Sequence, residues 1–271
     1  ISYQSEKIFI PLMILGMAII YRKELFNQWK KIILISLLSF IVLTPFIKET
    51  LQPNALIRFK GTSILEARKE ELAGKIGLER RFLMGQIIAK NYFLHFNPQW
   101  LFTNSGAESH KVPNLGLFYL WEAPFMMIGL LYLLRNIKQK TNQLLLWWIL
   151  AAPLPAALAT QSPHAMRIFQ ILPVPQILTA VGVMLTVNLI SSRFARTIFL
   201  FFLFGFFLLG MCSLYRNYFL VFPKEQSKSF QYVLKDAVGY VNQHQGEYNK
   251  IVFSNQDDFY QSYMFFLFYT R

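Results

Sequence analysis

The sequence alternates long apolar runs with short connections that are rich in Lys and Arg. Six apolar runs occupy residues 8–21, 32–47, 115–134, 144–159, 168–190 and 197–215. The hydrocarbon core of a bilayer is about 30 Å thick, and roughly 20 helical residues are needed to cross it. The pattern therefore predicts an all-α, multi-span membrane protein with about six transmembrane helices.

Three short connections, at residues 22–31, 135–140 and 191–196, carry nine basic residues and a single acid, Glu24. Lys and Arg near the ends of spans are retained on the cytoplasmic side of the membrane. When the six runs alternate across the membrane, all three connections fall on one side. This orientation predicts that residues 48–114, residues 160–167 and the carboxy-terminal tail lie outside.

Composition excludes a soluble nucleic-acid-binding protein, although the net charge is +13. The chain is 54% hydrophobic and only 15% charged, whereas about 25% of the residues in a soluble domain are charged. Most of the excess positive charge lies in the three basic connections. There it indicates which side of the membrane the connections occupy, and it attracts anionic lipids. We therefore expect membrane lipids as partners and no nucleic acid. The single cysteine, Cys212, excludes an intrachain disulfide.

Two parts of the chain are distinguished by their patterns. Residues 1–215 are predicted to form a transmembrane helical domain with an outer loop at 48–114. Within that loop, apolar residues recur at helical spacing among charges, which predicts helices lying flat at the outer membrane surface. Residues 216–271 are predicted to form a small outer-face α/β tail, with an amphipathic helix and then a strand at 250–254.

The run at 263–269 suits a second strand or a helix of that tail. Because the chain begins at Ile1 rather than Met and stops just after this apolar run, we interpret it as the carboxy-terminal part of a larger protein, with the tail truncated.

Motifs of known soluble enzymes do not occur in this sequence. It contains no phosphate-binding loop of the G-x-x-x-x-G-K-[ST] kind and no His-Glu-x-x-His, and its four histidines are scattered at positions 95, 110, 164 and 244. The sequence therefore identifies no metal site, and a dependence on a divalent metal stays open.

Two proline pairs flank the short outer loop at residues 160–167. Pro153 and Pro155 precede it, and Pro173 and Pro175 follow it. Proline removes a backbone donor and disturbs a helix, and broken helices at membrane depth are tolerated where protein or a wet cavity satisfies the freed groups. One interpretation is a polar vestibule at the outer face; the other is kinked packing around a solvated turn.

Four side chains are candidates for binding an anionic substrate. Arg167 is the lone cation of the short outer loop, and a guanidinium offers paired donors to a phosphate. His164 would share a helical face with Arg167 if the following helix begins early. Glu122 is either a site residue or a satisfied carboxylate near the interface. Arg58 suits a lipid phosphate or a generic headgroup contact.

Several phrases of the sequence resemble a known family. They are NYFLHFNPQWLF, GLFYLWEAPFMMIGLLYLL, LPAALATQSPHAMRIFQILP and YNKIVFSNQDDFYQSYMFFLFY. In order and phrasing they resemble the carboxy-terminal part of bacterial dolichyl-phosphate-mannose–protein mannosyltransferase-like proteins. These are membrane glycosyltransferases of family 39 type with the GT-C fold. The resemblance covers most of the chain from about Arg58 onward.

The resemblance implies an enzyme of the bacterial inner or plasma membrane. Such enzymes move a sugar from a polyprenyl-phosphate-linked donor to an acceptor on the outer face, by metal-dependent or carboxylate-assisted displacement. Their catalytic carboxylate usually lies in the first outer loop, which is expected upstream of Ile1. His164 and Arg167 would then stabilise the departing lipid phosphate.

Two other functions stay open at this point. A transporter or lipid flippase would also use proline-broken helices, although its internal repeat is not visible in the sequence. A noncatalytic membrane scaffold would need no polar vestibule, so substitution of His164 and Arg167 would be silent.

Overall fold

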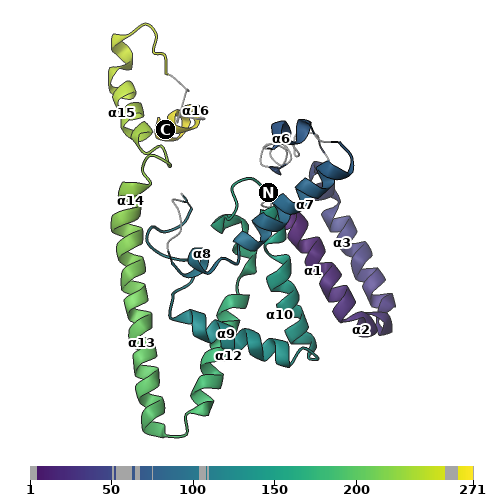
Figure 1. Cartoon of the computed structure of the whole chain (residues 1–271). Coiled ribbons are helices and arrows are strands. Elements are labelled where there is room, and N and C mark those ends of the chain that lie inside the picture. Colours follow the sequence, from purple (N-terminus) through teal and green to yellow (C-terminus); the bar gives the residue numbers. More distant parts are fainter. Residues whose placement is uncertain are drawn as a thin grey trace.

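A computed structural model describes residues 5–50, 52, 63–64, 68–74, 76–103, 108, 110–253 and 262–270. This described part is mostly helical and contains no strand, apart from an isolated antiparallel bridge between Ser63 and Ala159. Figure 1 shows long helices running between two ends of the molecule, with shorter helices gathered toward one of these ends.

The amino-terminal helices form a hairpin. Helix α1 (Glu6–Ile20) leads through the short α2 (Arg22–Asn27) to α3 (Trp29–Thr50). Helix α1 packs on α10 (Lys140–Ala151), where the Trp147 indole donates to the Leu12 carbonyl over 2.9 Å. Helix α3 leaves nearly all of its apolar side chains exposed.

Short helices of the predicted outer loop lie across one end of the molecule. They are α6 (Lys69–Ala73), α7 (Leu78–Leu94) and α8 (Pro98–Phe102). The helical periodicity predicted for this loop is confirmed in α7, where Leu83, Ile87 and Ile88 lie on the half-buried face. Asn91 and Tyr92 of the same face donate hydrogen bonds to the carbonyls of Ala157 and Leu150.

The central helices pack closely because two glycines face backbone. Helix α9 (Glu122–Arg135) crosses α12 (Val174–Leu189), and this pair makes the most extensive helix contact in the described part. Gly129 lies against the Leu178 backbone, and Gly182 lies against the Phe125 backbone. Between α10 and α12 the chain forms α11 (Leu154–Ala157) and two 3-10 turns, η1 (Ala165–Arg167) and η2 (Phe169–Ile171).

A long helix then leads into the tail. Helix α13 (Arg193–Arg216) continues through a π-helical turn, η3 (Asn217–Val221), into α14 (Phe222–Glu225). The tail contains α15 (Val233–His244), the 3-10 turn η4 (Gln245–Glu247) and α16 (Ser262–Tyr269). The amphipathic helix predicted here is confirmed: α15 buries Leu234 and Val238.

The strand predicted at 250–254 is wrong where the structure describes it. Residues 250–253 are irregular, and 254 lies outside the described residues. A strand needs a neighbour to pair its backbone groups, and the run at 263–269 supplies none because it forms α16. The described part of the tail is therefore helical rather than α/β.

Three helical segments are long and apolar enough to cross a membrane: Trp29–Glu49, Phe169–Leu189 and Arg193–Glu225. They correspond to the second, fifth and sixth apolar runs. The other three runs form α1, α9 and α10, of 15, 14 and 12 residues. At 1.5 Å per residue these reach only about 18–22 Å. The described structure thus shows three candidate spans, and six spans in the GT-C arrangement are not shown.

The proline pairs end helices as the sequence predicts. Helix α10 ends at Ala151 just before Pro153, and α12 begins just after Pro173. The apolar runs at 144–159 and 168–190 are therefore each divided. Their divided ends pack into the main core, which consists of Phe9, Met13, Trp100, Ala151, Ala152, Ile168 and Ile171.

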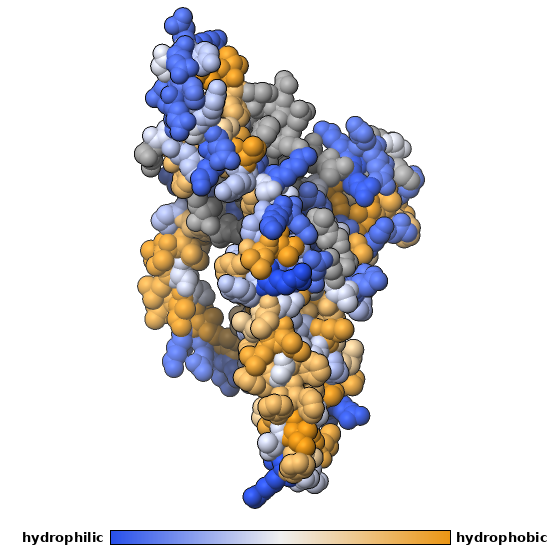
Figure 2. All heavy atoms as spheres, turned by 90° about the vertical axis from the view of Figure 1, so that its left-hand side faces the viewer, coloured by the Kyte–Doolittle hydropathy of each residue, from blue (hydrophilic) through white to orange (hydrophobic). Residues whose placement is uncertain are grey.

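The three basic connections lie on the lower side of the molecule in Figure 1, where α2 and the turn from α9 to α10 are close together and the turn from α12 to α13 lies apart from them. An ion pair between Glu24 and Lys140 ties the first two together, and the Lys140 ammonium also lies 5.5 Å from the centre of the Tyr21 ring. Figure 2 shows hydrophilic residues at the upper and lower ends of one face and hydrophobic residues between them.

Candidate functional site

A polar cluster forms where the outer-loop segment around α8 meets the loop before α12. We define it as His95, Trp100, Glu108, Lys111, His164 and Arg167. These residues come from two stretches of sequence that hydrogen bonds of His95 and Glu108 join. The cluster precedes α12, whereas the basic connection at 191–196 follows it. Helix α12, which has 16 residues and rises about 24 Å, lies between the two.

His164 and Arg167 lie together, although not on a regular helix. His164 has extended backbone and precedes the 3-10 turn η1, in which the Arg167 amide donates to the His164 carbonyl over 3.2 Å. The expected shared helical face is therefore wrong, because the chain makes this turn before α12 begins. The Arg167 guanidinium donates from Nη1 to the Thr160 carbonyl, which closes the loop.

His95 supports the loop through both nitrogens of its ring. Its side chain is 1% exposed, and its Nδ1 lies 2.8 Å from the Asn91 carbonyl. The backbone amide of His164 donates to His95 Nε2 over 3.4 Å. Together these contacts fix the tautomer with the proton on Nδ1, because Nε2 must accept. Burial lowers the pKa of His95, which keeps the imidazole neutral in this role.

Glu108 connects the two stretches of sequence through hydrogen bonds. Its Oε1 accepts from the Trp100 indole over 2.5 Å, and its Oε2 accepts from the Ala165 amide over 3.1 Å. The Trp100 side chain is 1% exposed and also meets the His95 ring edge to face, with the ring centres 5.6 Å apart. Hydrogen bonds to a carboxylate are among the stronger ones in proteins, so Glu108 holds the loop at 160–167 on α8.

Lys111 places a second cation inside the cluster. Its side chain is 5% exposed, and its ammonium lies 3.3 Å from the Trp100 carbonyl and 5.9 Å from the centre of the Trp100 ring. Burial lowers the pKa of this ammonium, and the nearby Glu108 carboxylate opposes that shift. Lys111 thus balances part of the negative charge that Glu108 brings into the protein.

His164 has an unused ring nitrogen. The side chain is 9% exposed, and Nδ1 is buried without a hydrogen-bond partner among the described residues. Burial lowers the pKa of His164 to about 4, and the charges of Arg167, His110 and His95 act in the same direction. The ring therefore stays neutral at pH 7. The exposed ring of His110 lies 5.4 Å away and in turn contacts Phe230 of the tail.

Glu122 has a local structural role. It lies in the first turn of α9, and its Oε2 accepts from the Tyr119 amide over 2.7 Å. A carboxylate is favourable at a helix amino terminus, where backbone donors are unpaired. Of the two interpretations of Glu122, this contact supports a carboxylate whose hydrogen bonding is satisfied locally. Glu122 therefore lies at the turn that contains Tyr119 and not in the polar cluster. Arg58 lies outside the described residues.

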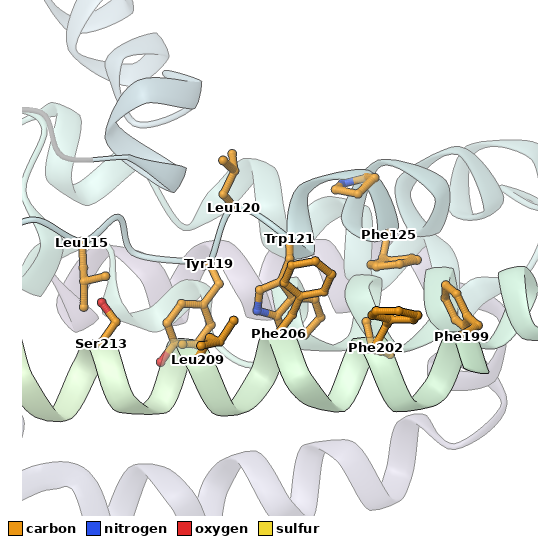
Figure 3. Close-up of a pocket in the computed structure, with 13 residues that line it drawn as sticks. Leu115, Tyr119, Leu120, Trp121, Phe125, Phe199, Phe202, Phe206, Leu209 and Ser213 are labelled. Carbon is orange, nitrogen blue, oxygen red and sulfur yellow. The ribbon is translucent and has the colours of Figure 1, made fainter. Parts of the chain in front are cut away.

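An apolar groove of about 690 Å³ runs beside α13. We name it the aromatic groove, and Figure 3 shows residues 115–125 lying along α13, with Leu115 near Ser213 and Phe125 near Phe199. It is lined by Leu115, Tyr119, Leu120, Trp121, Pro124, Phe125, Phe199, Phe202, Leu203, Phe206, Leu209, Gly210 and Ser213. The size lies within the usual range for ligand sites.

No part of the described residues holds three or more His, Cys, Asp or Glu side chains placed to bind a metal ion. Within the polar cluster, both Glu108 oxygens already accept from N–H donors and His95 is engaged at both nitrogens. His164 Nδ1, which is buried, and the guanidinium donors of Arg167 not bonded to Thr160 have no hydrogen-bond partner given among the described residues. Donors of this kind suit an oxyanion.

Comparisons with known protein families, with curated proteins and with solved structures find no match to this chain. The resemblance to membrane glycosyltransferases therefore depends on the quoted sequence phrases alone. A functional assignment for this protein depends on the geometry of the polar cluster and of the aromatic groove.

Proposed function

We propose that this protein acts in a membrane glycosyltransferase that moves a sugar from a polyprenyl-phosphate-linked donor to an acceptor on the outer face of the membrane. The observation that carries the proposal is the nearness of the Arg167 charge to His164, whose Nδ1 is buried without a hydrogen-bond partner among the described residues. Arg167 keeps guanidinium donors beyond the one that bonds the Thr160 carbonyl, so the two side chains together offer donors to one anionic group.

The chemistry of glycosyl transfer supports this use of the pair. When the bond between the anomeric carbon and the phosphate oxygen breaks, negative charge grows on the departing phosphate. Donors held in place before the reaction stabilise such charge, because they need no reorganisation. The Arg167 guanidinium has five N–H groups and spends one on Thr160. A neutral His164 with its proton on Nδ1 would add a further donor to a phosphate oxygen.

Glu108 acts in this scheme as a positioning residue rather than as the catalytic acid. Both of its oxygens accept from N–H groups of the protein, and these bonds hold the loop at 160–167 in place. The family likeness implies that the catalytic carboxylate lies before Ile1. The proposal therefore gives these residues the task of holding the lipid phosphate, with Lys111 and Trp100 fixing the loop that carries them.

Orientation supports an outer-face location. The polar cluster and the connection at 191–196 lie at opposite ends of a 21-residue candidate span. Lys and Arg of short connections are retained in the cytoplasm. The three basic connections lie on the same side of the molecule in Figure 1, so the proposed orientation puts the opposite side, with the cluster, outside.

The test measures transfer from polyprenyl-phosphate mannose carrying a tritium label, in membranes that contain the full-length protein. Arg167→Ala should reduce transfer about 100-fold, comparable to the loss of one key oxyanion donor, and Arg167→Lys should restore only part of it because a lysine lacks the planar fork. The matched control is Arg80→Ala, which removes an exposed arginine of α7.

Equal transfer by Arg167→Ala and by Arg80→Ala would overturn the assignment of the phosphate to Arg167. Transport of the lipid without sugar transfer by the unaltered protein would instead favour a flippase. Each variant is compared at the same amount of membrane-inserted protein, so that a loss of expression is not counted as a loss of chemistry.

A further inference from the structure

Three aromatic rings from distant parts of the chain meet beside the polar cluster. The His110 ring lies 5.4 Å from the His164 ring, and Phe230 of the tail meets His110 edge to face with ring centres 6.2 Å apart. These residues belong to the outer loop, to the loop before α12 and to the tail. We name them the ring stack, and through it the tail reaches the residues proposed to hold a phosphate.

The buried nitrogen of His164 is closed to a ligand in this structure. Its Nδ1 has no hydrogen-bond partner among the described residues, and the side chain is 9% exposed. An unpaired buried polar group is unfavourable, so a ligand that pairs with Nδ1 would relieve this cost. Such a ligand reaches Nδ1 only after a neighbouring side chain has moved.

Of the side chains around His164, His110 is the least restrained. His95 is 1% exposed and engaged at both ring nitrogens, and the Arg167 guanidinium is bound to a backbone carbonyl. His110 is exposed, and among the described residues its ring makes aromatic contacts and no hydrogen bond. The position of His110 therefore depends on whether Phe230 is in place.

A row of rings links Phe230 to the end of α13. Phe230 lies 5.6 Å from Phe222 of α14, and Phe222 stacks on Tyr218 with ring centres 5.9 Å apart. Tyr218 belongs to the π-helical turn η3, where the long candidate span passes into the tail. Such turns are rare and occur frequently at functional sites. A change at this turn would move Phe230, and with it the support of His110.

Backbone conformation distinguishes the same three places. In the described part of the chain, three residues other than glycine have a positive φ: Gln161 and Asn114 at 59° and Gln231 at 53°. Each of them lies within four residues of a different member of the ring stack. Such conformations are uncommon outside glycine. They gather at ligand clamps and switch regions, where the surrounding structure holds them.

We propose that the ring stack is a latch, in which Phe230 of the tail holds His110 against His164 and release of the tail opens the polar cluster to an anionic ligand. The proposal rests on the proposed function for the identity of that ligand, a polyprenyl phosphate. It adds to that function a closed state, in which the phosphate site is covered until the tail moves. Lids that open and close in this way control the access of substrate and water to many enzyme sites.

Diethyl pyrocarbonate, which modifies accessible neutral imidazoles, measures the latch without any ligand. In the purified full-length protein, exposed His110 and buried His95 serve as references for His164 in the same digest. The minor form of a two-state protein is commonly about 0.1–10% populated. Phe230→Ala should therefore raise the modification rate of His164 at least about tenfold, while His95 stays protected.

Tyr232→Ala is the matched control, because it removes an exposed ring of the same turn that lies by Lys235 rather than by the ring stack. Phe230→Tyr keeps the ring, so it should leave His164 as protected as it is in the unaltered protein. Equal modification of His164 in Phe230→Ala and in Tyr232→Ala would overturn the latch.

A reversible cross-link tests closure in the opposite direction. In a Cys212→Ser background, His110→Cys and Phe230→Cys are joined by a short bismethanethiosulfonate reagent, and dithiothreitol cleaves the bridge. The cross-linked protein should protect His164 and should bind undecaprenyl phosphate at least about tenfold more weakly than the same protein after cleavage. Equal protection and equal binding before and after cleavage would contradict the latch, whatever the effect of Phe230→Ala on folding.

Failure of the latch and failure of the proposed function give different results. Protection of His164 that follows the cross-link, found together with binding of undecaprenyl phosphate that does not, would retain the latch and reject the proposed phosphate site. Binding that depends on Arg167 but not on the cross-link would retain the phosphate site and reject the latch.

Discussion

At the scale of single residues, the shape of the polar cluster depends on the hydrogen bonds of Glu108. This residue joins the Trp100 indole to the Ala165 amide, which lies 57 positions further along the chain. Glu108→Ala leaves both donors without their acceptor, and a hydrogen bond to a charged group contributes about 1.5–3 kcal/mol. We expect a loss of about 2 kcal/mol in unfolding free energy.

This loss should appear as a lower thermal unfolding midpoint of the purified protein, with Glu247→Ala of exposed η4 as the control. A double-mutant cycle with Trp100→Phe isolates the indole contact, because that substitution removes the donor and keeps a ring. Additive effects of the two substitutions would show that they do not interact.

His164 gives the cluster a predictable dependence on pH. Its folded-state pKa is about 4, below the usual value of about 6.5. Between these values the unfolded chain binds more protons, so stability is fully present above pH 6.5 and falls as the pH falls toward 4. The expected slope is at most about 1.4 kcal/mol per pH unit from this residue.

His164→Gln should flatten the stability profile between pH 6.5 and 4, measured as the thermal midpoint in a pH series. The groups facing His164 are Arg167, His110 and His95. Because burial also lowers the pKa of His95, part of the acid sensitivity should remain in the single variant. His244→Gln on α15 is the control, and an unchanged profile for His164→Gln would contradict the expectation.

The sequence predicted two of these side chains and missed the rest for a physical reason. His164 and Arg167 were indicated by their place between proline pairs. His95 and Glu108 have no comparable local signal, because nothing in the nearby sequence shows that α8 folds back onto residues 160–167. The contacts of Glu108 span 8 and 57 positions. A periodicity of three or four residues carries no information about a contact at such distances.

At the scale of secondary-structure elements, the crossing of α9 and α12 depends on small residues. Gly129 and Gly182 each lie against backbone atoms of the opposite helix. A methyl group at either position would push the helices apart, and overpacking of this kind costs about 1–3 kcal/mol. We expect Gly129→Ala and Gly182→Ala to lower the thermal midpoint of the purified protein.

Gly85→Ala is the matched control because a Cβ there meets nothing within 4 Å on α7. Alanine favours a helix over glycine by up to about 1 kcal/mol, so this variant should be neutral or slightly stabilised. A gain in stability at Gly129 or Gly182 would show that the two helices separate without cost.

The elements also show where hydropathy is informative and where it is not. The apolar runs and the prolines predicted the helices and their interruptions, because both depend on local chemistry. Run length did not predict helix length: residues 115–121 are apolar but precede α9, and they form a wall of the groove instead. The strand predicted at 250–254 failed because pairing is a tertiary property that an apolar triplet cannot show.

At the scale of the whole molecule, charge and apolar surface are arranged along one direction. Basic connections lie on one side, the polar cluster and the tail lie toward the other, and exposed phenylalanines of α13 lie between. Three candidate spans fit this arrangement. The shorter helices α1, α9 and α10 lie in the same zone, where α1 packs on α10 and α9 packs on α12. A placement of all three basic connections on one side of a membrane would require α9 and α10 to cross it as well.

The final prediction tests this arrangement in a membrane. In a Cys212→Ser background, Lys138→Cys places a thiol on the exposed connection between α9 and α10, and Glu247→Cys places one on the exposed η4 of the tail. The proposed orientation places the basic end in the cytoplasm, the side on which Lys and Arg near span ends are retained. An impermeant maleimide applied to intact cells should therefore label Glu247→Cys at once and label Lys138→Cys only after the membrane is opened. Labelling of both before opening would place the two thiols on one side, which requires an even number of crossings between residues 138 and 247. That result would contradict the alternation of the apolar runs and would remove the outer-face location from the proposed function.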